Sequence, residues 1–102
     1  MSEKLTVVAR IRAKPGKEEE VKQALLGLVG PTRGEAGCLN YDLHQSHDDA
    51  ALFLFYEDWT SRAALDAHAQ SAHIQAFRAR GRELLAEPTE IKLFRMVSNQ
   101  AT

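Results

Sequence analysis

His68 is the residue of this sequence whose surroundings most favour acid–base chemistry. If the segment after residue 60 is helical, His68 shares one stripe with Leu65 and Ala72, and that stripe should face the body of the protein. An imidazole there titrates near neutral pH and could accept a proton from an acidic hydroxyl such as a phenol. The alternative is a core histidine bonded to a backbone carbonyl. The sequence leaves both roles open, and we predict His68 as a general base.

Aromatic side chains form a second group of candidates. Five of them fall in two strand-like segments: Tyr41, Phe53, Phe55, Tyr56 and Trp59. Such rings could line an apolar pocket for a flat aromatic ligand, although aromatic residues in strands more often belong to a core or an interface. Trp59 ends its strand where a helix should begin, and Tyr41 brings a hydroxyl group onto an apolar face. We predict Tyr41, Phe55 and Trp59 as pocket wall.

Histidine and cysteine spacing argues against a metal centre. His68 and His73 are five residues apart, which places them about 140° apart around a continuous helix. His44 and His47 fall on opposite faces of a strand, so no four-ligand cluster emerges and we expect no bound metal. Cys38 has no partner in the chain and no basic neighbour in the local sequence, which predicts an inert thiol and a reducing compartment.

Composition excludes several classes of function. The chain has 102 residues, 13 of them basic and 14 acidic, for a net charge of -1. This near balance gives no excess of positive charge that would favour binding to nucleic acid or to an anionic membrane. Three arginines lie close together in the sequence, Arg78, Arg80 and Arg82, but they should spread around a solvated helix. No apolar run approaches the length of a membrane span, and residues 1–4 show no signal-peptide features. We expect one cytoplasmic domain comprising residues 1–102.

The pattern of apolar residues predicts the elements that position these side chains. Alternation indicates strands over residues 4–14, 37–47, 50–59 and 89–97. Three- and four-residue spacing indicates helices over 17–29, 61–69 and 71–86, the last two forming a pair or one bent helix. Gly30-Pro31 should end the first helix, and Ser61 and Ser71 should cap the others. Residues 98–102 should form a tail.

The predicted order β-α-β-β-α-β is that of the ferredoxin-like arrangement, an α+β fold with a core over about residues 4–97. In that architecture, helices cover one face of the sheet and leave the other bare. The segment Leu52–Tyr56 is apolar on both faces, so a bare face would expose it to water. We therefore expect a homodimer in which two sheets pack face to face as a dimeric α/β barrel.

Three segments of the sequence resemble a known family. They are Leu5–Gly16, with its Pro-Gly turn, Glu35–Tyr41, and Glu57-Asp-Trp59 followed by His68, His73 and Phe77. The chain resembles the antibiotic biosynthesis monooxygenase domain family, and most closely its small quinol monooxygenases. The resemblance spans residues 5 to about 97.

The resemblance implies a dimeric enzyme that oxidises a quinol- or polyphenol-like aromatic with O2, without metal or flavin. It implies His68 as the catalytic base and Tyr41, Phe55, Trp59 and His73 as substrate-binding residues. Haem-degrading relatives use Asn, Trp and His where this chain has Ala9, His68 and Arg78, which speaks against haem degradation. Two alternatives stay open: an isomerase or lyase of a small metabolite using the same histidine, and a module that binds an aromatic ligand without catalysis.

Overall fold

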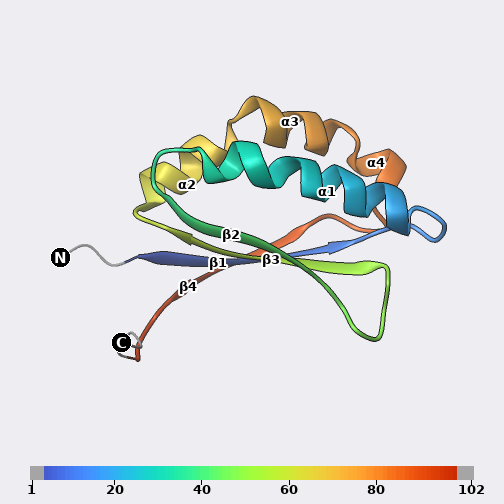
Figure 1. The fold of residues 1–102 in the computed structure, drawn as a ribbon, viewed down its shortest axis with the longest axis horizontal. Coiled ribbons are helices and arrows are strands. Elements are labelled where there is room, and N and C mark those ends of the chain that lie inside the picture. Colours follow the sequence, from blue (N-terminus) through green and yellow to red (C-terminus); the bar gives the residue numbers. More distant parts are fainter. Residues whose placement is uncertain (1–3, 99–102) are drawn as a thin grey trace.

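A computed structural model describes residues 4–98 of the chain, so the expectations for the first three residues and for 99–102 lie outside the described part. The described elements follow one another in the order β1 (Leu5–Arg12), α1 (Glu18–Arg33), β2 (Cys38–Gln45), β3 (Leu52–Trp59), α2 (Arg62–Ala69), α3 (Ala72–Ala79), α4 (Gly81–Leu84) and β4 (Glu90–Arg95). The helices lie in one layer over a single sheet (Figure 1).

The sheet has four antiparallel strands in the order β2-β3-β1-β4. Together with the helices on one face, this order confirms the predicted ferredoxin-like α+β fold. Alternation in β1 turns Val7, Ala9 and Ile11 toward the helices, where all three are buried. Ala9 lies opposite Phe55 of β3, and Glu57 of β3 lies opposite both Val7 and Tyr41 of β2. The register therefore groups Tyr41, Phe55 and Glu57 on the helix-covered face.

Helix α1 continues past the point where the sequence was expected to end it. Pro31 lies inside the helix, which runs to Arg33, so the prediction that Gly30-Pro31 stops it is wrong. A proline near a helix end removes only one hydrogen bond, and Gly30 before it has no side chain to clash with the ring. The extra turn buries Thr32 completely and places Glu35 just beyond the helix end.

The segment after β3 breaks into three helices instead of one or two. Ser61 caps α2 as predicted, and its Oγ accepts a hydrogen bond of 3.1 Å from the amide of Ala64. Ser71 stands at the N-cap of α3 but makes no capping bond from its side chain; its Oγ donates to the carbonyl of His68 at 2.7 Å. The chain turns between α2 and α3, so Ala72 is exposed and does not share the buried stripe of His68.

A tight turn leads into β2. Gly37 has a φ of +87°, and a Cβ added there would lie 2.5 Å from the Cβ of Ala64 and 2.7 Å from Oγ1 of Thr60. Only glycine combines this backbone conformation with such close packing. The turn fixes how α2 sits against the start of β2, and thereby how His68 meets Tyr41.

The last strand packs less tightly than its apolar pattern suggested. Every residue of β4 is exposed, including Ile91, Leu93 and Phe94, and Val97 beyond it is 88% exposed. On the sheet face away from the helices, Leu54 is half-buried and Tyr56 is 38% exposed. The single chain thus presents apolar side chains on its bare face and along its β4 edge.

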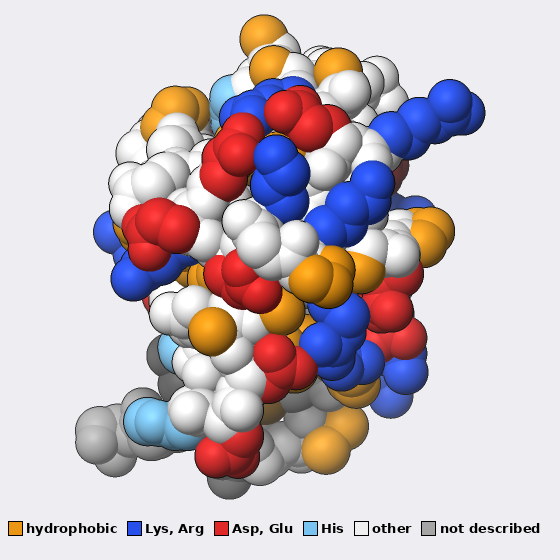
Figure 2. All heavy atoms as spheres, turned by 90° about the vertical axis from the view of Figure 1, so that its right-hand side faces the viewer, with side chains coloured by type: hydrophobic (Ala, Val, Ile, Leu, Met, Phe, Trp, Pro, Cys, Tyr) orange, Lys and Arg blue, Asp and Glu red, His pale blue; other side chains and the backbone are white. Residues whose placement is uncertain are grey.

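Acidic and basic side chains are mixed on the face of the molecule that Figure 2 shows. Figure 2 shows acidic and basic side chains interleaved on one face of the molecule, with no area of a single sign. Among the helices of residues 4–98, none has the length and apolar character needed to cross a bilayer.

Candidate active site

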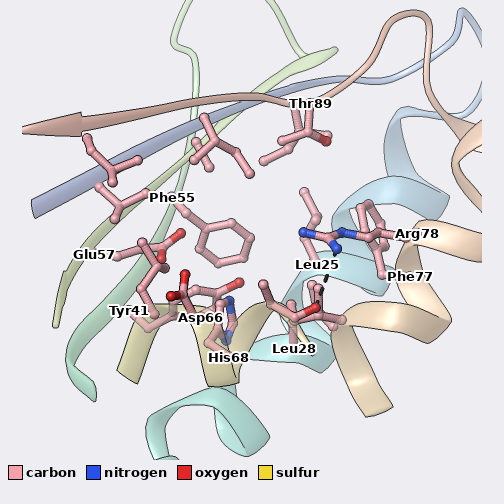
Figure 3. Close-up of a pocket in the computed structure, with 18 of the residues that line it drawn as sticks. Leu25, Leu28, Tyr41, Phe55, Glu57, Asp66, His68, Phe77, Arg78 and Thr89 are labelled. Carbon is pink, nitrogen blue, oxygen red and sulfur yellow. Dashed lines mark hydrogen bonds between the residues drawn. The ribbon is translucent and has the colours of Figure 1, made fainter. Parts of the chain in front are cut away.

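A cavity of about 250 Å³ lies between the helix layer and the sheet. Its apolar wall combines strand residues with helix residues, chiefly Val7, Ala9, Ile11, Leu25, Leu28, Phe55, Leu65, Ile74, Phe77, Ile91 and Leu93. In Figure 3, Tyr41, Glu57, Asp66 and His68 gather at one end of the cavity, and Arg78 stands at the other. An apolar chamber with a few polar groups at one end suits a flat, mostly apolar ligand that carries hydroxyl or carbonyl groups.

His68 lies at the polar end and is held from behind by a carboxylate. Its Nδ1 is 2.9 Å from Oε2 of Glu35, and only 8% of its side chain is exposed. A carboxylate next to Nδ1 keeps the proton on that nitrogen and leaves Nε2 with a free lone pair. Glu35 therefore sets the tautomer that a base requires.

Nothing in the described chain hydrogen-bonds to Nε2 of His68, and no enclosed side-chain nitrogen or oxygen among residues 4–98 lacks a partner. Nε2 must therefore reach open space, and His68 lines the cavity. The arrangement differs from a core histidine with both nitrogens bonded to protein groups, which was the alternative from sequence.

Two aromatic residues form the wall next to His68. The rings of Tyr41 and Phe55 stack with centroids 4.2 Å apart, and the Tyr41 ring meets the imidazole edge-on at 5.4 Å. Burial is the main cause that raises the pKa of Tyr41 far above its usual range, with the charge of Glu57 adding to it. A hydrogen bond with the side chain of Thr32 opposes this change, and Tyr41 keeps its proton at physiological pH.

Glu57 is a functional candidate that the sequence reasoning passed over. It lines the cavity, is only 4% exposed and accepts a hydrogen bond of 2.9 Å from Nε1 of Trp59. Burial raises its pKa to about 7, the hydrogen bond from Trp59 opposes this, and the charge of Glu35 adds a smaller upward push. The alternation of β3 could have revealed it, because residue 57 shares a face with Phe53 and Phe55.

Trp59 and His73 occupy positions other than those expected of ligand-contacting residues. Neither is among the residues that line the cavity. Trp59 is fully buried behind the wall, with its indole 4.7 Å from the imidazole of His68 between ring centroids. His73 Nε2 is 2.7 Å from Oε2 of Glu35 and 3.1 Å from Oγ1 of Thr32. Both residues support the site from outside the cavity.

The structure overturns the geometric argument that kept the two helix histidines apart. That argument assumed one continuous helix, but His68 belongs to α2 and His73 to α3. The turn between the helices brings the imidazoles together on Glu35, with the three possible ligand atoms within 4.8 Å of one another. The spacing argument therefore missed a cluster of three possible metal ligands, although three ligands do not contradict the prediction that no four-ligand cluster forms.

Two other residues agree with their expected environments. Cys38 is partly buried, and burial followed by the charge of Glu35 raises the pKa of its thiol, which disfavours the reactive thiolate. Arg78 is exposed as expected of a solvated helix face, although its side chain also borders the cavity and donates to the carbonyl of Ala69 at 3.4 Å.

Known proteins are similar to this chain in sequence and in fold. The family model described as Antibiotic biosynthesis monooxygenase matches residues 4–80. A Mycobacterium tuberculosis protein, Putative monooxygenase Rv0793, is 38% identical over 91 residues, which make up 89% of each chain. A Synechocystis protein, Uncharacterized protein sll1783, is 35% identical over 94% of this chain, which spans 65% of that relative's length. The crystal structure of PA3566 from Pseudomonas aeruginosa has a TM-score of 0.91 at 40% identity and covers 96% of this chain and 98% of that one.

The fold and the site define a small α+β protein of the ferredoxin-like class, with an apolar cavity between its two layers and a carboxylate-supported histidine at one end of that cavity. Within that class, the family model covers most of the chain, and relatives above 30% identity cover nearly all of it. The chain belongs to the antibiotic biosynthesis monooxygenase family. Membership supports a monooxygenase-type function.

Proposed function

We propose that this protein is a monooxygenase that oxidises a quinol- or polyphenol-like aromatic with O2. The observation that supports the proposal most is that His68 lines an apolar cavity and has no protein hydrogen bond on Nε2 within the described part of the chain, while Glu35 lies 2.9 Å from its Nδ1. A ring stacked near Tyr41 and Phe55 would place a phenolic hydroxyl within reach of that nitrogen.

The chemistry balances without an external reductant. His68 removes one phenolic proton, and the electron-rich anion gives electrons to O2. One oxygen atom bonds to the ring carbon beside the anion, the O–O bond then breaks, and the second oxygen leaves as water. For a simple hydroquinone, the product is the hydroxylated quinone, and all four electrons that reduce O2 come from the substrate.

The other residues at the polar end would bind and orient the substrate. Tyr41 contributes a neutral aromatic ring, and Glu57 offers a carboxyl group that is close to half-protonated at pH 7. Donors that point toward developing negative charge in an apolar chamber stabilise it more strongly than in water. We assign Tyr41 and Phe55 to substrate binding, His68 to catalysis, and Trp59 and His73 to support of the catalytic imidazole.

We also propose that the working unit is a homodimer. The β4 strand exposes Ile91, Leu93 and Phe94, and two of these residues also line the cavity. A second copy that covers this edge and the bare sheet face would bury these side chains and close the cavity from outside. Light scattering during size-exclusion chromatography should report twice the chain mass at micromolar concentration. Phe94→Glu should shift the protein to a monomer, and a monomeric wild type contradicts the proposal.

Turnover of naphthoquinols provides the test of the activity. Purified protein should accelerate O2 uptake, and ¹⁸O₂ should place one labelled oxygen atom in the product. His68→Gln should lose most of this uptake, whereas His44→Gln, at an exposed histidine outside the cavity, should keep it. If His68→Gln retains the wild-type rate, the assigned base is wrong. Turnover that persists without oxygen would favour an isomerase or lyase, and saturable binding without product would favour a binding module.

A further inference from the structure

We propose that Glu35, His68 and His73 form a binding site for a divalent transition-metal ion of the Zn²⁺ type, and that an ion bound there disables His68 as a base. The site lies on the far side of the imidazole from the cavity, between the end of α1 and the turn that joins α2 to α3. Its regulatory consequence rests on the proposed function, whereas ion binding does not.

The donor set matches the ion. Two imidazole nitrogens and a carboxylate oxygen are the three protein ligands found at many zinc centres, with solvent in the fourth position. Oε2 of Glu35 lies 2.9 Å from Nδ1 of His68 and 2.7 Å from Nε2 of His73. All three atoms lie within 4.8 Å of one another, so small side-chain shifts would give each a bond of about 2.0–2.1 Å to one central ion.

The surroundings of the cluster favour a cation. Glu35 has no ion pair with lysine or arginine in the described chain, and its carboxylate pairs with the two imidazoles instead. Oγ1 of Thr32 at 3.1 Å and Oγ of Ser71 at 3.3 Å place two hydroxyl oxygens beside Nε2 of His73. The side chains of Glu35 and His73 are 17% and 22% exposed, which leaves a route for the ion and room for a solvent ligand.

Binding would change which nitrogen of His68 carries the proton. In the metal-free site, Nδ1 holds the proton that bonds to Glu35, and Nε2 is the free base. An ion on Nδ1 requires that nitrogen to be unprotonated, so the proton moves to Nε2 and no net proton is gained or lost. The nitrogen that faces the cavity then becomes a donor and cannot accept the phenolic proton.

Metal titration of the intact protein tests the site directly. Co²⁺ should bind at one ion per chain with visible absorption bands of a low-coordinate site, and Zn²⁺ should displace it. His73→Gln keeps an N–H donor for Glu35 but removes a ligand, and it should weaken binding by at least about tenfold. Glu35→Gln, which keeps an acceptor for both histidines, should do the same, and His44→Gln should bind like the wild type.

Activity measurements test whether a bound ion inhibits His68, separately from whether the ion binds. Stoichiometric Zn²⁺ should suppress most naphthoquinol-dependent O2 uptake by the wild type, and a chelator should restore it. Absence of saturable binding, or equal weakening by His44→Gln, overturns the site. Binding that leaves uptake unchanged overturns the proton relocation on His68. A protein that binds the ion but never oxidises a quinol would refute the proposed function and leave the metal site intact.

Discussion

Glu57→Gln is expected to stabilise the protein at alkaline pH. The buried carboxyl group of Glu57 has a pKa of about 7, raised from an ordinary 4.5 mainly by burial. Each pKa unit corresponds to about 1.4 kcal/mol, so ionised Glu57 costs the folded state about 3 kcal/mol. Glutamine has nearly the same shape, stays neutral at every pH and can still accept the hydrogen bond from Trp59.

The sign follows from the direction of the pKa change. Well below pH 4.5 the carboxyl group is neutral in the folded and the unfolded protein, so it does not change the free energy of unfolding. Between pH 4.5 and 7 the unfolded chain releases the proton more readily than the folded one, so stability falls as pH rises. The advantage of Glu57→Gln should therefore be less than about 1 kcal/mol at pH 5 and about 3 kcal/mol at pH 8.

Urea unfolding followed by far-ultraviolet circular dichroism, at one protein concentration and at both pH values, measures the difference. Glu87→Gln replaces an exposed carboxylate with the same charge change and should show no such pH-dependent gain. A gain for Glu57→Gln that is equal at pH 5 and pH 8 would mean that Glu57 is not held in a charge-disfavouring environment. A loss of stability at pH 8 would mean that its negative charge is stabilising.

Two further predictions concern the support of the site. Glu35→Gln should lower kcat for quinol oxidation by about tenfold to hundredfold with little change in KM. The reason is that a neutral amide stabilises the required His68 tautomer less well than the carboxylate, while the cavity lining stays the same. A change confined to KM would contradict this. Gly37→Ala should cost more than about 1 kcal/mol of unfolding free energy, because the new Cβ would meet Ala64 at 2.5 Å in a left-handed backbone conformation. The matched change Gly27→Ala, in open space on α1, should stabilise by up to about 1 kcal/mol, and equal effects of the two in urea unfolding would refute the argument.

The period of the apolar residues was sufficient to predict the fold class. Alternation in residues 5–12 and 52–59 and helical spacing around Val21 and Leu25 reflect which side chains must leave water, and this requirement is local in the sequence. Element ends were less predictable. Pro31 usually terminates a helix, but burial of Thr32 and Leu28 against the sheet outweighs the loss of one hydrogen bond, so α1 gains a turn.

The candidate site was only partly visible in the sequence. His68, Tyr41 and Phe55 were identified because their residue types and faces could be deduced, and all three line the cavity. Trp59 was assigned to the wall because it is aromatic and ends its strand where a helix begins, yet at the last position of β3 it is fully buried and does not line the cavity. Glu57 was missed because a carboxylate on an apolar face is unexpected until its hydrogen bond and burial are known.

By itself, the sequence determined the class of fold, the face of each strand and the one imidazole most suited to act as a base. These properties depend on the order and period of residue types, which a linear pattern contains. The tertiary structure alone decided that Glu35 stands behind His68 and that His73 joins them, at sequence separations of 33 and 38. Those contacts depend on where α1 ends and how the turn after α2 rotates the next helix, and both are set by packing against the sheet.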